Sequence, residues 1–269
     1  MQYKCLSIAG FDGSGGAGIQ ADLKTFSALG CYGMTVLTAL PIQNTCGVKG
    51  CYEIPPAAIY DQLEVIFDDI VPDTIKIGML FSSEIINLVA KFLYERAQNI
   101  PIIVDPVMIA KSGDRLLQED AVHALKSSII PLATIITPNL PEARALIQEE
   151  DENKMLAKRL LDLRCGAVLL KGGHGTGITS DDIFVDQQDN LHALSSARIV
   201  SKNIHGTGCT LSAAIASFLA RGLSVFESCK LAKKYLSKAI YMAKDQSVGK
   251  GHGPVNHFHN LWTHNKLEQ

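Results

Sequence analysis

Short apolar runs rich in β-branched residues alternate with longer segments of helical periodicity along the whole chain. The apolar runs predict eight strands, the last two of them as a hairpin or an edge pair. These strands span residues 4–9, 34–40, 74–77, 102–104, 134–136, 168–170, 183–185 and 197–200. The periodic segments predict eight helices. These helices span residues 18–29, 57–69, 83–97, 119–127, 140–147, 153–164, 209–221 and 225–244.

No linker, repeat or low-complexity tract interrupts this alternation, which is typical of a parallel sheet with crossover helices. The 269 residues exceed an average domain of ~150, but α/β folds of ~200–250 residues often form one unit. We therefore predict one domain over residues 1–269, with an α/β fold. The expected architecture is a three-layer α/β/α sandwich with a central, mostly parallel sheet. Ligands of such folds bind at the carboxyl ends of the strands, where loop 10–18 emerges.

One uncharged segment, residues 25–48, is as long as a membrane span. Glycine, proline and amide residues interrupt it, so it is interpreted as a helix end, a strand and a polar loop. The first ten residues hold only a five-residue apolar run, which is too short for a secretory signal. We expect neither a membrane association nor export.

The overall composition narrows the class of partner. The chain has 25 basic and 27 acidic residues and no long basic run, so we expect no nucleic-acid partner. A small-molecule partner fits this balance better. The seven cysteines are odd in number and scattered, and none of them forms a C-x-x-C pair. This usage is typical of a protein of the reducing cytoplasm.

The first glycine-rich loop, residues 13–18, fits the pattern G-x-G-x-x-G between a predicted strand and a predicted helix. A dinucleotide site would also need an acidic residue about 20 positions later, and residues 33–40 contain none. Two interpretations remain. The glycines permit either a simple chain reversal or a close approach of the backbone to a ligand.

The second glycine-rich loop, HGTGCT at residues 205–210, leads directly into a predicted helix. The free amides at a helix amino terminus form an anion site. The helix dipole at this position is expected to lower the pKa of the Cys209 thiol, which would suit a catalytic base. The alternative for Cys209 is a small buried side chain. The P-loop pattern G-x-x-x-x-G-K-[ST] is absent from the sequence, so a P-loop kinase is not expected.

Ten motifs in order along the chain carry a resemblance to a known family. They are SIAG (7–10), SGGAGIQADLKT (14–25), QNT (43–45), KIGM (76–79), DPVM (105–108), KSG (111–113), TPNLPE (137–142), KGGH (171–174), HGTGCT (205–210) and GHGPVNHF (251–258). The chain resembles the hydroxymethylpyrimidine/phosphomethylpyrimidine kinases of the ribokinase-like superfamily. The resemblance implies ATP-dependent phosphorylation of 4-amino-5-hydroxymethyl-2-methylpyrimidine, and then of its monophosphate, in thiamine biosynthesis. It also implies ATP and Mg²⁺ as cofactors and a homodimer.

The same resemblance assigns roles to individual residues. The anion hole for the transferring γ-phosphoryl group would comprise Gly206, Thr207, Gly208 and Cys209, with Cys209 as the base. The nucleotide would be approached by Asn139 and Lys171, and magnesium by Glu142 and Asp105. The substrate pocket would include Gln43, Asp22, Met79 and Val107. These roles suit phosphoryl transfer, which depends on charge neutralisation and in-line positioning.

Three of these residues have structural alternatives. The Gln43 carboxamide offers a donor and an acceptor to the amine and ring nitrogen of an aminopyrimidine, but it would also suit a turn cap. A carboxylate such as Glu142 suits magnesium, yet this residue is also placed to cap a helix beside Pro141. Asp105 has an alternative structural role at the end of a strand.

The chain also departs from the family pattern. Phe11 and Gly13 replace the serines of a usual Ser-Asp-Ser, and Pro41-Ile42 replaces a usual Thr-Ala. These changes affect the expected pocket rim, and therefore substrate affinity and breadth. The histidines at 252, 257, 259 and 264 fit no standard zinc spacing, and the resemblance instead implies a structured loop near the nucleotide.

Two other functions remain open from the sequence. Pyridoxal kinases share this fold and the Gly-Thr-Gly-Cys loop, so pyridoxal kinase activity is one alternative. A non-catalytic pyrimidine-binding regulator is the other, although an intact set of Cys209, Glu142 and Lys171 argues against it.

Overall fold

The computed structural model describes residues 2–108, 121–173, 175 and 177–262. Its centre is an eight-stranded sheet in the order β10-β9-β8-β7-β6-β5-β1-β2. The parallel strands are β1 (Lys4–Ala9), β2 (Tyr32–Leu37), β5 (Thr74–Ile77), β6 (Ile102–Val104), β7 (Ile135–Ile136) and β8 (Ala167–Leu170). An antiparallel hairpin at one edge comprises β9 (Thr179–Asp186) and β10 (Leu191–Ala197). The predicted α/β sandwich with a mostly parallel sheet is therefore confirmed.

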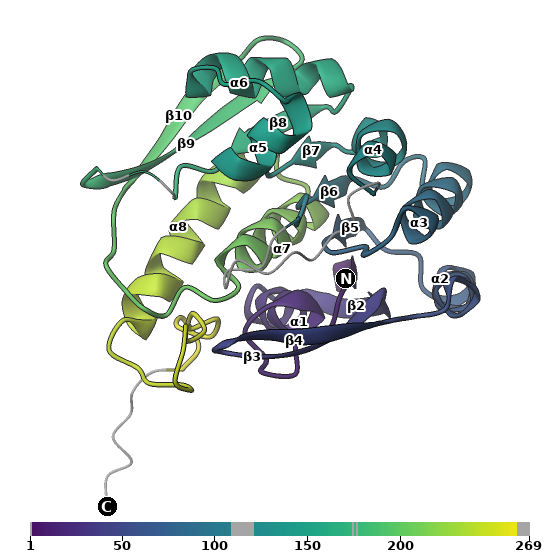
Figure 1. Ribbon diagram of the computed structural model, residues 1–269, viewed down its shortest axis with the longest axis horizontal. Helices are drawn as coiled ribbons and strands as arrows, with labels where there is room; N and C mark the ends of the chain where they lie inside the picture. The colour runs from purple at the N-terminus through teal and green to yellow at the C-terminus, as the bar shows by residue number, and fades with distance from the viewer. Residues whose placement is uncertain (1, 109–120, 174, 176, 263–269) are drawn as a thin grey trace, which may run out of the picture.

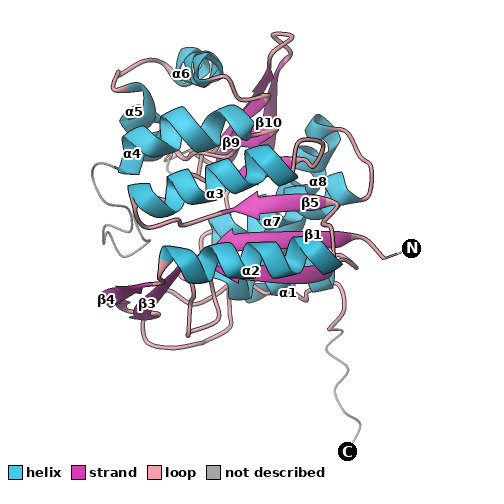
Figure 2. Cartoon of the chain, turned by 90° about the vertical axis from the view of Figure 1, so that its right-hand side faces the viewer, coloured by secondary structure: helices cyan, strands magenta, loops and turns pink. Residues whose placement is uncertain are grey.

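Helices cover both faces of this sheet (Figures 1 and 2). One face carries α2 (Pro56–Asp69), α3 (Ser83–Arg96), α4 (Ala121–Ala124), α5 (Leu140–Ile147) and α6 (Asn153–Leu160). A π-helical turn, Leu125–Ile129, continues α4. The other face carries α1 (Gly18–Ala28), α7 (Thr207–Ala220) and α8 (Val225–Ala243). Among the described residues, no helix is long and apolar enough to span a membrane.

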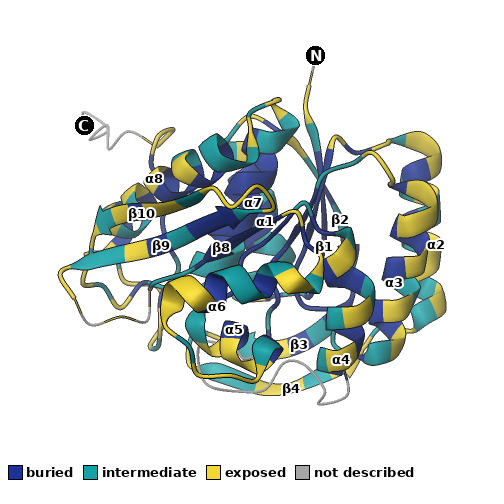
Figure 3. Cartoon of the chain, turned by 90° about the horizontal axis from the view of Figure 1, so that it is seen from above, coloured by how far each residue is buried: buried dark blue, intermediate teal, exposed yellow. Residues whose placement is uncertain are grey.

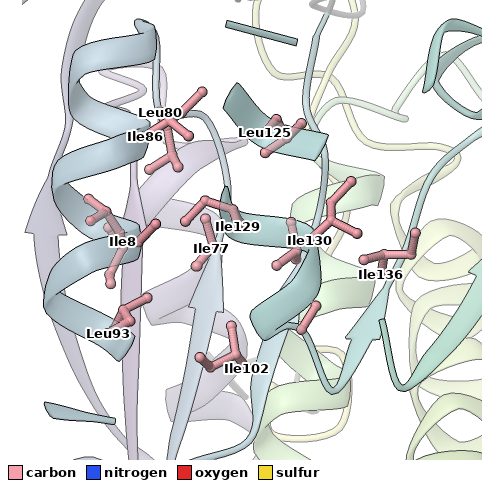
Figure 4. Close-up of a cluster of buried hydrophobic side chains, with 14 of the residues drawn as sticks. Ile8, Ile77, Leu80, Ile86, Leu93, Ile102, Leu125, Ile129, Ile130 and Ile136 are labelled. Atoms are coloured by element: carbon pink, nitrogen blue, oxygen red, sulfur yellow. The ribbon is translucent and has the colours of Figure 1, made fainter. Parts of the chain in front are cut away.

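Each face of the sheet builds its own hydrophobic core, because successive strand residues point to opposite faces. Ile8, Ile77 and Ile136 pack with helix residues such as Leu93 in one cluster (Figure 4). Leu6 of β1 belongs to the same cluster, whereas the preceding residue, Cys5, belongs to the second cluster with side chains of α1, α7 and α8. The five central strands β1, β5, β6, β7 and β8 are therefore buried on both faces (Figure 3), which explains their continuous apolar runs.

The predicted strand 34–40 is wrong in its second half. β2 ends at Leu37, and Thr38 turns away with its hydroxyl donating to the carbonyl of Met79 at 2.5 Å. Ala39 then begins β3 (Ala39–Asn44), which pairs with β4 (Gly47–Glu53) in a separate two-stranded sheet. The predicted polar loop is thus part of a β-hairpin, which lies beyond the edge of the main sheet (Figure 2).

The predicted strand 197–200 is also largely wrong. β10 ends at Ala197, and Val200 is 91% exposed outside it. The strand itself is polar, and only Leu194 among its residues is buried, so the apolar residues after it gave a false signal. At α7 the prediction begins two residues late. The first two residues of the predicted helix 119–127, the whole motif 111–113, His174 of the motif 171–174 and His264 lie outside the described residues.

Candidate active site

A cavity of about 680 Å³ opens at the carboxyl ends of five parallel strands. Its wall includes the residue or segment that follows each of β1, β5, β6, β7 and β8: Gly10, Met79, Asp105, Asn139 and Lys171. This is the edge at which ligands of parallel α/β sheets bind. Eleven of the twelve predicted site residues line it. They are Gln43, Met79, Val107, Asp105, Asn139, Glu142, Lys171, Gly206, Thr207, Gly208 and Cys209.

The loop 206–209 forms the first turn of α7. Gly206 is the N-cap with φ 76°, and a side chain there would overlap the carbonyl oxygen of Gly16. The Thr210 amide donates to the Gly206 carbonyl at 2.8 Å, which begins the hydrogen-bond ladder of the helix. The amides of Gly208 and Cys209 precede this bond and therefore have no carbonyl within the helix to donate to. Together with the helix dipole they form an anion site that faces the cavity.

An ammonium group and two carboxylates gather beside this helix turn. Lys171 Nζ lies 2.7 Å from Asp105 Oδ1 and 3.8 Å from Glu142 Oε2. A Cβ atom on Gly208 would lie 3.2 Å from Asp105 Oδ2 and 3.4 Å from Lys171 Nζ. Because residue 208 is glycine, the backbone of the anion site lies next to the Asp105 carboxylate and the Lys171 ammonium group.

Glu142 caps a helix and is also buried next to Lys171. It forms a capping box at the start of α5, where the Asn139 amide donates to Glu142 Oε2 at 2.8 Å and Asn139 Oδ1 accepts from the Glu142 amide. The structural alternative of a helix cap is therefore confirmed. Burial raises the pKa of Glu142 to about 7, although the charge of Lys171 opposes this effect. The carboxylate is accordingly poised to gain or lose a proton near neutral pH.

The carboxylates of Asp105 and Glu142 also fit a magnesium ion. Magnesium prefers hard oxygen ligands and keeps several waters, so one or two carboxylates beside substrate phosphates suffice. Among the residues that the structure describes, no cluster of three or more metal-ligating side chains forms a closed cage. Lys171 Nζ lies within 4 Å of an oxygen of each carboxylate.

The pKa prediction for Cys209 is wrong in direction. Burial raises the pKa of its thiol to about 11, although the positive charge of Lys76 acts to lower it. The sulfur also accepts a hydrogen bond from the backbone of Gly18. The cost of desolvating a thiolate therefore outweighs the helix amino terminus and the nearby ammonium.

Asp22 is the one predicted site residue that does not line the cavity. Its side chain is fully buried in α1, where both carboxylate oxygens accept from Lys76 Nζ at 2.8 and 3.0 Å. The hydroxyl of Ser7 donates to the same carboxylate at 2.5 Å. Lys76, to which the sequence analysis assigned no role, lines the cavity, whereas Asp22 does not. The sequence did offer a sign of this role, because a lysine between two isoleucines in a buried strand needs a buried partner for its charge.

The other end of the cavity lies against the β3–β4 hairpin. Gln43 is half-buried there, and its Nε2 donates to the Phe11 carbonyl at 3.4 Å. Met79 and Val107 add apolar wall, and Met79 Sδ lies 3.1 Å from where a Cβ on Gly10 would be. An amide beside apolar surface suits a flat heteroaromatic ring with polar edges.

Sequence reasoning also missed a side-chain hydrogen bond that joins the two glycine-rich loops. His205 Nε2 lies 2.7 Å from Asp12 Oδ2. The Asp12 carboxylate also accepts from the amides of Ser14, Gly16 and Ala17, and its pKa is held well below the usual range despite burial. Both residues stand in the quoted motifs or next to them, but only their contact reveals this role.

A second missed set lies where the cavity meets the edge hairpin. The Arg198 guanidinium donates to the carbonyls of Gly173, Gly177 and Thr179 at 2.9, 2.7 and 2.8 Å. Asp182 and Lys233 form a buried ion pair at 2.8 Å beside it. Arg198 thereby holds the backbone that follows Lys171.

Comparison with known proteins gives one consistent result. Residues 12–256 match the family model described as phosphomethylpyrimidine kinase. A hydroxymethylpyrimidine/phosphomethylpyrimidine kinase of Salmonella typhimurium is 48% identical over 97% of this chain and 99% of its own. A thiamine biosynthesis bifunctional protein of Geobacter sulfurreducens is 49% identical over 94% of this chain, which spans 51% of that longer protein.

A solved structure is similar over the full length. The pyridoxal kinase of Staphylococcus aureus, in complex with AMP-PCP, has a TM-score of 0.86 and 35% identity. The alignment covers 100% of this chain and 96% of that one. A kinase with a different named substrate therefore has this same fold.

Proposed function

The chain belongs to the phosphomethylpyrimidine kinase family, and from that premise we propose that it transfers the γ-phosphoryl group of ATP to a hydroxymethylpyrimidine and then to its monophosphate. The product would enter thiamine biosynthesis. The observation that carries the proposal is the convergence of Lys171, Asp105 and Glu142 on Gly208 at the amino terminus of α7. Such a site neutralises and orients a transferring phosphoryl group.

Each part of this site has a role in the proposed reaction. The amides of Gly208 and Cys209 bind the γ-phosphoryl oxygens, and Lys171 adds positive charge. Magnesium, held by Glu142 and Asp105, would further neutralise the phosphates when bound. Cys209 as thiolate accepts the proton of the substrate hydroxyl. Because the pKa of its thiol is about 11, thiolate is the minor form near neutral pH, and the rate is expected to rise with pH.

Gln43 is the proposed recognition element for the pyrimidine. Its carboxamide sits at the rim of the cavity and, among the described residues, makes a long hydrogen bond to the Phe11 carbonyl. It can therefore turn to the exocyclic amine and adjacent nitrogen of an aminopyrimidine. Pyridoxal has no ring amine and cannot complete the same pair of bonds.

Pyridoxal kinase activity is the second candidate, because the Staphylococcus aureus enzyme shares the fold. A steady-state assay with both alcohols and ATP separates the two functions. For Gln43→Leu, we expect kcat/KM for the pyrimidine to fall about ten- to hundredfold, as for loss of a good bidentate contact. Any pyridoxal activity should change less. An equal fall for both substrates would show that Gln43 supports the loop, and a wild-type preference for pyridoxal would contradict the substrate assignment.

The resemblance supports further proposals about organisation. We expect a single domain that forms a homodimer and works in the cytoplasm. All seven cysteines lie among the described residues as free thiols, which agrees with a reducing compartment. Light scattering on the purified protein would test the dimer.

A further inference from the structure

Three glycines at alternate positions mark a segment near the carboxyl terminus. Residues 249–254, which we call the strap, begin after α8 and contain Gly249, Gly251 and Gly253. The sequence analysis expected a loop near the nucleotide in this motif. The structure places the strap between the turn of the β3–β4 hairpin and the residue before the anion site, as Figure 1 shows in yellow beside β3.

One end of the strap is fixed to Thr45, in the turn that follows β3. The Gly251 amide donates to Thr45 Oγ1 at 3.2 Å, and the His252 amide donates to the Thr45 carbonyl at 2.9 Å. A side chain on Gly249 would overlap the Thr45 hydroxyl, and one on Gly251 would overlap the Thr45 carbonyl. Only glycine permits so close an approach at these two positions.

The other end of the strap is fixed beside the anion site. The His205 amide donates to the Gly253 carbonyl at 3.0 Å, and His205 and Pro254 form a parallel β-bridge. His205 directly precedes Gly206, and its ring is paired with Asp12 at 2.7 Å. A side chain on Gly253 would overlap Oδ1 of Asn203. Both ends of the strap are thus closely packed.

The hairpin turn lies close in sequence to the proposed recognition residue. Thr45 is two residues after Gln43, and a β-bulge between Ile42 and Gln43 leaves this end of the hairpin irregular. Gln43 pairs with Val48 beyond this bulge, and the contacts at Thr45 add a further constraint at the same end of the hairpin. The main sheet does not pair with this hairpin, so it gives no support through a β-ladder.

We propose that Thr45 is a positioning residue that, through the strap, couples pyrimidine binding at Gln43 to nucleotide binding at loop 206–209. The inference rests on the proposed function, because it takes Gln43 and the anion site as the two binding points. A nucleotide that orders residues 205–209 would order the strap and hence the hairpin. Since binding coupling is reciprocal, the pyrimidine would tighten nucleotide binding by the same factor.

The test compares Thr45→Val, which keeps the shape of the side chain but removes the hydroxyl, with the matched control Thr45→Ser. Calorimetry would give the Kd of the hydroxymethylpyrimidine with and without AMP-PCP and magnesium. In wild type and Thr45→Ser, we expect the analogue to tighten pyrimidine binding. Thr45→Val should bind the pyrimidine roughly two- to tenfold more weakly, as for loss of one hydrogen bond, and should lose most of the tightening.

Gly251→Ala provides a second variant, since its methyl group would push the strap away from the Thr45 carbonyl. It should show the same loss of coupling, and its circular dichroism spectrum should match that of wild type. Wild-type affinity and tightening in both variants, or no tightening in wild type, would overturn the role of Thr45. If Gln43→Leu also binds pyrimidine normally, the proposed function fails as well. A normal Thr45→Val beside a weakened Gln43→Leu overturns only the coupling.

Discussion

Lys76 Nζ lies 2.8 Å from Asp22 Oδ2, and both side chains are fully shielded from solvent. Lys76 lines the cavity with Asp22 behind it, and the Lys76 charge acts on the Cys209 thiol. Two charges at such depth depend on each other, because either one alone would be a buried, uncompensated ion.

We expect Lys76→Met to destabilise the protein by ~3–5 kcal/mol, because it leaves the Asp22 carboxylate buried without its partner. The double variant Lys76→Met/Asp22→Asn should recover much of this loss. Urea unfolding at pH 7 measures both changes. A cost below ~1 kcal/mol for the single variant would show that the pair contributes little to stability.

Replacing Cys209 by alanine should lower kcat by roughly 10²–10⁴, as for loss of a general base, while pyrimidine binding is retained. The reason is the position of the sulfur in the first turn of α7, facing the cavity. Single-turnover kinetics and calorimetry separate the two effects. A wild-type rate in Cys209→Ala would leave the residue with a packing role only.

The raised pKa of Cys209 makes a separate prediction about pH. Burial holds the thiol protonated below a pKa of about 11, so its alkylation by iodoacetamide should accelerate about tenfold per pH unit between pH 7 and 9. Peptide mass spectrometry distinguishes this site from the exposed Cys46, and Cys209→Ala serves as the control. A plateau below pH 8 would show instead that the helix amino terminus dominates.

Glu142→Gln should raise the magnesium concentration for half-maximal rate, since one oxygen ligand or water-orienting carboxylate is lost without a change of shape. The same substitution should weaken magnesium binding but stabilise the fold relative to wild type at neutral pH. Burial raises the pKa from 4.5 to about 7, so the folded protein retains a proton that the unfolded chain has lost between these values. The contribution of Glu142 to stability is present below pH 4.5 and is lost as the pH rises through 7.

Because glutamine does not ionise, Glu142→Gln should gain stability relative to wild type as the pH rises from 4.5 to 7. Thermal unfolding at pH 4.5, 6 and 8 tests the trend, with Asn139 unchanged so that the helix cap can remain. A constant difference across this range, together with unaltered magnesium dependence, would restrict Glu142 to its capping role.

The central strands of the main sheet were predictable from sequence because they are buried on both faces, which gives continuous apolar runs. β1, β5 and β6 match the predicted limits in full. The β3–β4 hairpin was missed for the opposite reason. Its residues are mostly exposed, with Ile42 at 45% and Tyr52 at 68%, so neither alternation nor a buried run marks it.

The site was predictable where its chemistry is local and less so where it depends on distant contacts. A glycine loop leading into a helix identified the anion site at 206–209. The partner of Lys76 lies 54 residues away in α1, and the local pattern gave no sign of it. The same limit explains the error for Cys209, because helix position is visible in the sequence whereas the burial of its sulfur is not.

The β3–β4 hairpin forms a sheet of its own, hydrogen-bonded to the rest of the chain at its base through Phe11 and Ala39 and at its turn through Thr45. In the proposed function, recognition of the acceptor alcohol and transfer of the phosphoryl group therefore fall to two sheets that do not pair with each other and that the strap connects. Residues 39–53 form a natural unit of exchange, which a graft from a kinase with another acceptor could replace while the catalytic scaffold stays intact. In the proposed function, a change of acceptor substrate would then involve this hairpin together with Met79 and Val107, which line the same cavity.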